Sequence, residues 1–121
     1  GLAIYTVHGD HWTVGTDEEA TEAAKIAVKD SAWAFNSQYL SDGTGIPEVA
    51  FSAMQENLSE DANEPIWKIV DATWDGEGDG FLDDAIEADG RGHFLSGYDG
   101  EEVEKSVGFG ADIHDMYLYR I

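Results

Sequence analysis

The spacing of apolar residues predicts strands at both ends of the chain and helices between them. Residues 2–7 form an apolar, β-prone segment, and residues 12–14 form a second short one. Glycine and aspartate lie between the two segments, which favours a β-hairpin. At the other end, residues 117–121 predict a terminal strand that pairs with this hairpin.

Apolar residues at helical spacing predict four helices in the middle of the chain. The first begins at a capping box, in which Thr16 and Glu19 can each bond the other's backbone amide, and its apolar stripe continues to Tyr39. The other helices are expected at residues 46–58, 63–74 and 81–88, with a loop at 75–80. Beyond residue 89 glycine is frequent and the periodicity is weak until the terminal strand.

Helices in the middle and strands at both ends predict an α+β fold. We expect a small antiparallel sheet, built from the N-terminal hairpin and the C-terminal strand, packed against three to four helices. The chain has 121 residues, of which 42% are hydrophobic, and this is enough for a core. No repeat or linker divides it, so residues 1–121 are expected to form a single acidic domain.

Acidic residues outnumber basic ones by 26 to 6, which gives a net charge of −20 with histidine neutral. This balance disfavours direct binding to nucleic acid, because that affinity comes mostly from Lys and Arg neutralising phosphates. Binding to an anionic membrane surface is disfavoured for the same reason. No segment has the roughly 18 to 20 consecutive apolar residues of a membrane span. Cysteine is also absent, which is compatible with the cytoplasmic location that we expect.

Three interpretations of the charge remain open at this stage. Charge far from zero keeps a protein soluble, and the acidic residues need have no other role. Acidic residues spread over the whole chain are also typical of adaptation to high salt, in a domain of unassigned function. In the third interpretation, spaced carboxylates mimic nucleic acid and occupy the basic groove of an enzyme that handles DNA or RNA.

The chain shows no recognisable catalytic motif. Ser96 does not lie in a G-x-S-x-G sequence, and no phosphate-binding glycine loop with its lysine is present. Carboxylate pairs are so common that none can be singled out as an acid–base couple. We therefore expect a protein that is not an enzyme.

The segment 75–86 suggests a second, different function, because it follows the register of an EF-hand calcium loop. Acidic residues occupy loop positions 1, 3, 5 and 9, and Gly80 occupies position 6. Position 12 is isoleucine where a bidentate glutamate should close the cage. The alternative hypothesis is a calcium-binding or calcium-stabilised domain whose ligands are Asp75, Glu77, Asp79 and Asp83.

Several segments resemble a known group of proteins. They are ADGRGHFLS at 88–96, GYDGEE at 97–102, YLYR at 117–120, WAFN at 33–36 and DAN at 61–63. With them the chain resembles small uncharacterised acidic proteins encoded by bacteriophages, prophages and plasmids, over roughly residues 30–121. The resemblance implies no catalytic residues. Those relatives have a shorter connection at 74–79, which weighs against calcium binding as a family property.

The leading hypothesis is a non-enzymatic binding protein of a phage or other mobile element. It would present an acidic surface to a basic host protein, such as a nucleic-acid-handling enzyme. Arg91, an isolated base among acidic residues, is expected to pair with nearby carboxylates and fix its loop. The acidic residues expected to contact the partner are Asp83, Asp84, Glu101, Glu102 and Glu104.

Overall fold

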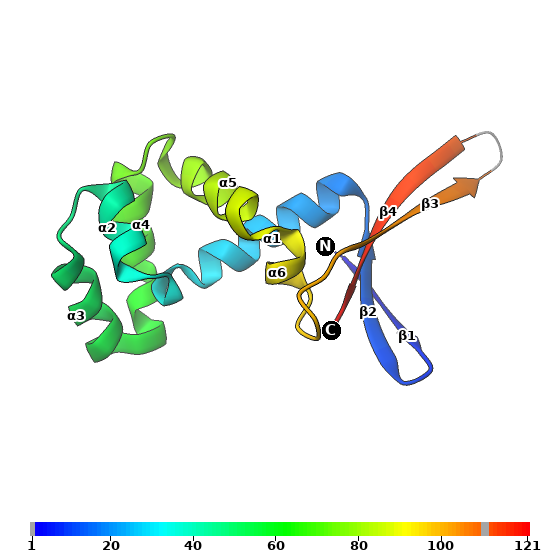
Figure 1. Cartoon of the computed structure of the whole chain (residues 1–121), viewed down its shortest axis with the longest axis horizontal. Coiled ribbons are helices and arrows are strands. Elements are labelled where there is room, and N and C mark those ends of the chain that lie inside the picture. Colours follow the sequence, from blue (N-terminus) through cyan, green and yellow to red (C-terminus); the bar gives the residue numbers. More distant parts are fainter. Residues whose placement is uncertain (1, 110–111) are drawn as a thin grey trace. The chain divides into compact units, whose positions relative to one another are not determined.

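The computed structural model describes residues 2–109 and 112–121 and shows the expected α+β fold (Figure 1). The chain forms two compact units: the first contains the residues up to Ala27 and from Ile86 onward, and the second contains Val28–Ala85. The division falls within helices α1 (Asp17–Asp30) and α5 (Glu77–Asp89), so each of these helices contributes residues to both units.

The first unit contains a four-stranded antiparallel sheet in the order β1-β2-β4-β3. Thr13 of one strand lies opposite Tyr119 of another, so the predicted pairing of the hairpin with the C-terminal strand is confirmed. One edge strand, β3, was not expected, because its exposed segment Glu104–Ser106 is polar and lacks an apolar alternation. The strands are β1 (Ala3–Val7), β2 (Asp10–Gly15), β3 (Val103–Phe109) and β4 (Asp112–Arg120).

The predicted hairpin is confirmed, and its turn fixes the register. His8 and Gly9 both have positive φ angles, of 52° and 84°. Two such residues suit a two-residue turn whose twist matches that of the flanking strands. Consequently Val7 lies opposite Asp10 at the end of the hairpin.

The expected first helix is too long, because α1 ends at Asp30 and a new helix begins at Ser37. Asn36 caps the new helix, since its side chain accepts hydrogen bonds from the amides of Gln38 and Tyr39. The other expected helices are present. The helical elements between α1 and α5 are η1 (Ala32–Ala34), α2 (Ser37–Thr44), α3 (Glu48–Leu58), η2 (Ser59–Ala62) and α4 (Asn63–Thr73), and α6 (Arg91–Leu95) follows α5.

An aromatic cluster forms the core of the second unit. Phe81 is fully buried, and its ring centroid lies 5.0 Å from the centroids of both Phe35 and Trp74. Trp67 and Tyr39 contribute further rings at 6.2 and 6.3 Å. Tilted and edge-on pairs of this kind stabilise a core beyond the area that they bury.

The glycines at 76–80 allow the chain to turn tightly into helix α5. Gly76 has a φ of 81°, which favours glycine. The amide of Gly78 donates a hydrogen bond of 3.1 Å to the carboxylate of Asp71, which caps the start of the helix. A Cβ atom on Gly80 would lie only 2.0 Å from the carbonyl oxygen of Asp75. The glycine-rich sequence is therefore explained by close packing of backbone on backbone.

The EF-hand-like loop expected at 75–86 is wrong as local structure. Helix α5 begins at Glu77, so Glu77, Asp79 and Asp83 lie on a helix instead of a loop. Glu77 and Asp79 are two residues apart on this helix and do not face each other. Among the side chains that the structure describes, no three His, Asp or Glu residues form a group that could hold a metal ion.

We predict that Gly80→Ala lowers the free energy of unfolding by about 1–3 kcal/mol, because the new methyl group would force the backbone of Asp75 aside. Urea unfolding followed by circular dichroism would measure the loss. Gly97→Ala is the matched control, since a Cβ there meets nothing within 4 Å. Equal stability of the two variants would contradict the packing argument.

We also predict that the two units unfold together, as the sequence-based expectation of one domain requires. Helices α1 and α5 supply residues to both units, so melting either unit removes part of the other. Native-state hydrogen exchange would test this. The amides of Tyr119 in the first unit and Val70 in the second should report the same opening free energy. Two clearly different values would show that the units are separate cooperative domains.

Candidate functional site on helix α1

A buried arginine organises the first unit. Arg91 begins α6, and its side chain is only 13% exposed. Its Nε donates to Glu102 at 2.8 Å, and its Nη1 donates to the Asp17 carboxylate at 2.8 Å and to Thr21 at 3.1 Å. The guanidinium also lies 4.5 Å from the ring centroid of Tyr117. The expectation that Arg91 pairs with nearby carboxylates is confirmed.

Tyr119 completes this network from β4. Its side chain is fully buried, and its hydroxyl donates a hydrogen bond to the same Glu102 oxygen that Arg91 contacts. Burial, and then the bond to Glu102, raise the pKa of Tyr119. Burial lowers the pKa of Arg91, but its bonds to Glu102 and Asp17 outweigh this and the net shift is upward. The network therefore holds a neutral phenol and a charged guanidinium.

The start of α1 is fixed by the predicted capping box. The amide of Thr16 donates to the Glu19 carboxylate at 3.1 Å, and the amide of Glu19 donates to the Thr16 hydroxyl at 3.3 Å. The first of these bonds lowers the pKa of Glu19, so the carboxylate is charged at neutral pH. Together with the contacts of Arg91 to Asp17 and Thr21, the box determines where the first turns of α1 lie.

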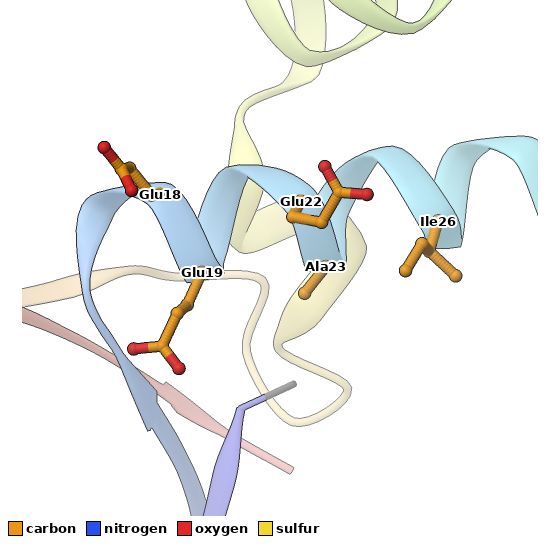
Figure 2. A pocket seen from close by; sticks show the side chains of 5 residues that line it. All are labelled: Glu18, Glu19, Glu22, Ala23 and Ile26. Atoms are coloured by element: carbon orange, nitrogen blue, oxygen red, sulfur yellow. The ribbon is translucent and has the colours of Figure 1, made fainter.

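A hollow of about 300 Å³ lies along these turns (Figure 2). Two rows of side chains line it at helical spacing, one of Glu18, Glu22 and Ile26, the other of Glu19, Ala23 and Ile26. The rows converge on Ile26, which is 54% exposed. The hollow thus combines three carboxylates with an aliphatic floor.

This combination suits the side chain of a lysine or arginine. Such a side chain can lay its aliphatic stem on Ala23 and Ile26 while its charged head reaches a carboxylate at the edge of the hollow. Glu18 and Glu22 are four residues apart on the helix, and like charges at this spacing weaken it. A cation bound near these two carboxylates would relieve that repulsion.

The structure does not gather the five acidic residues expected to contact a partner within one unit. Two of them belong to the second unit and three to the first. Asp83 and Asp84 lie in the second unit, where the Asp84 carboxylate accepts a hydrogen bond of 3.1 Å from the Trp74 indole. Glu101, Glu102 and Glu104 lie in the first unit, where Glu102 accepts a hydrogen bond from Arg91.

The glutamates of the hollow were not singled out from the sequence. Acidic residues in the first turn of a helix are accounted for by its dipole and by capping, which explained Glu18 and Glu19 without a ligand. The signal that could have found the site is the repeat of Glu18, Glu22 and Ile26 at four-residue spacing, beside Glu19 and Ala23.

No protein family, curated protein or solved structure matches the chain. The resemblance to proteins of phages and plasmids therefore stays a prediction and assigns no residue of this site. Within the part of the chain that the structure describes, no helix is long and apolar enough to cross a membrane.

We predict that Tyr119→Phe lowers the free energy of unfolding by about 2 kcal/mol at neutral pH, because the hydrogen bond to a charged partner is lost. Since the folded-state pKa of Tyr119 is raised above its ordinary value of 10.0, its contribution is complete below pH 10 and is lost as the pH rises further. Urea unfolding between pH 7 and about pH 11 should therefore show a smaller alkaline loss in Tyr119→Phe than in the wild type. The exposed Tyr5→Phe is the control and should follow the wild type; equal alkaline losses in all three proteins would contradict the argument.

Proposed function

We propose that this protein binds a basic protein without catalysing a reaction, and that the hollow on α1 is the centre of its binding surface. The observation that carries the proposal is the union of Glu18, Glu19 and Glu22 with the aliphatic floor of Ala23 and Ile26. Such a surface can distinguish a lysine or arginine side chain from a simple cation, because the apolar stem contributes to binding as well as the charge.

The charge balance supports a cationic partner. The chain has 26 acidic and 6 basic residues, which leaves an excess of 20 negative charges with histidine neutral. The base Arg91 is occupied by two carboxylates, and Arg120 is paired with Asp10 at 2.6 Å. The remaining negative field would attract a basic protein and accelerate its association at low salt.

A nucleic-acid-handling enzyme is the kind of partner that fits best. Its binding groove is basic because it must neutralise phosphates, and carboxylates spaced along a helix can occupy the same positions. Glu101 and Glu104 are exposed in the same unit as the hollow and would add to its field. The resemblance to proteins of phages and plasmids suggests that the partner is a host protein.

The proposal is tested by titrating the protein with a ten-residue lysine peptide in a calorimeter, at low and at raised salt. The triple variant Glu18→Gln, Glu19→Gln and Glu22→Gln should bind about tenfold more weakly and with a shallower salt dependence, since exposed ion pairs each contribute up to about 1 kcal/mol. Glutamine at position 19 can still complete the capping box, so the helix should be retained.

The matched control removes three other exposed glutamates and has the same net charge. The triple variant Glu56→Gln, Glu60→Gln and Glu87→Gln should bind the peptide within about twofold of the wild type. These three side chains are exposed and lie away from the hollow in sequence. Equal losses in the two variants would show that only the total charge matters and would refute a site on α1.

A further inference from the structure

The edge strand β1 is open on both faces. The residues from Ala3 to Thr6 are all exposed, with Ile4 at 66% and Tyr5 at 56%. Proteins usually protect a free edge strand with charged residues or proline. The strand AIYTV contains neither. The opposite edge strand, β3, does carry charges, since Glu104 and Lys105 are exposed on it. The two edges therefore differ, and β1 is the one suited to pairing.

The register of the hairpin shows which backbone groups of β1 face outward. In a hairpin with a two-residue turn, the residues that flank the turn bond each other, here Val7 and Asp10. Bonding alternates along an antiparallel pair, so Tyr5 is directed to β2, and the amide and carbonyl groups of Ile4 and Thr6 are directed to the open edge. A second strand could bond to them.

The beginning of β1 lies beside the hollow on α1. A Cβ atom on Gly15 would meet the side chain of Leu2 at 2.2 Å and Cβ of Glu19 at 3.2 Å. Leu2, just before β1, and Glu19, which lines the hollow, therefore lie next to the same glycine. Figure 2 shows the start of β1 beneath the Glu19 side chain. The start of the open edge thus lies close to Glu19, one of the residues that line the hollow.

We propose that an extended segment of the basic partner adds to the sheet as a strand antiparallel to β1, with a lysine or arginine beyond its carboxyl end in the α1 hollow. This inference rests on the proposed function. Antiparallel pairing matches the rest of the sheet and places the carboxyl end of the added strand beside Leu2 and Glu19. The charge of −20 on each copy opposes pairing with a second copy of this chain and favours a cationic partner.

The test uses three synthetic peptides and calorimetry on the whole protein. The first peptide has six alternating threonine and valine residues followed by three lysines. The second is identical but carries N-methyl groups on alternate strand amides, which removes their hydrogen bonds. The third replaces the strand with glycine and serine and keeps the lysines. The first should bind about tenfold more tightly than the other two.

Two variants of β1 test whether the tighter binding of the first peptide depends on this strand. Ile4→Pro removes one outward amide, a change that an edge strand tolerates, and should abolish the preference for the first peptide. Ile4→Val keeps the amide and should retain the preference. Circular dichroism verifies the fold of both variants. If Ile4→Pro does not fold, the N-methylated peptide on the wild-type protein still decides the question.

The outcomes separate the two proposals. If all three peptides bind equally and the Glu18, Glu19 and Glu22 variant weakens them all, the strand inference is overturned and the proposed function stands. If that variant changes nothing, the proposed function fails. Should the wild type sediment as a dimer and Ile4→Pro as a monomer, the edge would be occupied by a second copy, and the inference would also be overturned.

Discussion

The first unit depends on one buried cation, the guanidinium of Arg91. In a chain with 26 acidic and 6 basic residues, bases are scarce, and this one bonds Glu102 before β3 and Asp17 at the start of α1. Loss of the arginine would remove the cation from Glu102, the carboxylate that also accepts the hydrogen bond of the buried Tyr119 hydroxyl. The same contacts determine where the first turns of α1 lie. The glutamates of the hollow therefore owe their position to a residue that does not line it.

The second unit is stabilised in a different way, with little help from charge. Phe81 lies among four aromatic rings, and the helix that carries it begins at glycines that allow very close approach. A Cβ atom on Gly78 would meet the Trp67 ring at 2.8 Å. Two acidic residues bond to this core, Asp71 through the amide of Gly78 and Asp84 through the indole of Trp74, but the ring contacts themselves do not depend on charge. This explains how a small domain can carry so high a charge and still have an ordered core.

The sequence predicted those elements whose signals are local. The capping box of Thr16 and Glu19 lies at the start of the helix that it begins, and the hairpin was visible in the glycine and aspartate between its two β-prone segments. The break between α1 and α2 depends instead on distant side chains: Gln55 donates to the carbonyls of Trp33 and Phe35, and Asn63 also bonds this segment. No local pattern records such contacts. The segment at 75–80 was wrongly predicted to be a calcium loop for a related reason. Its glycines are required by close packing and by the turn into α5, and the sequence pattern alone does not show this.

The open strand β1 and the acidic residues of α1 would contribute different properties to a binding surface. Carboxylates alone attract any basic surface and give little direction, whereas an open apolar edge alone invites self-association. On this unit the repulsion between copies that each carry −20 opposes pairing of β1 with itself. A cationic segment experiences the opposite field, and only an extended one can satisfy the backbone groups of Ile4 and Thr6. In the proposed complex, the negative charge would favour a cationic strand over a second copy of the chain, and the open backbone groups of β1 would favour an extended segment over other cations.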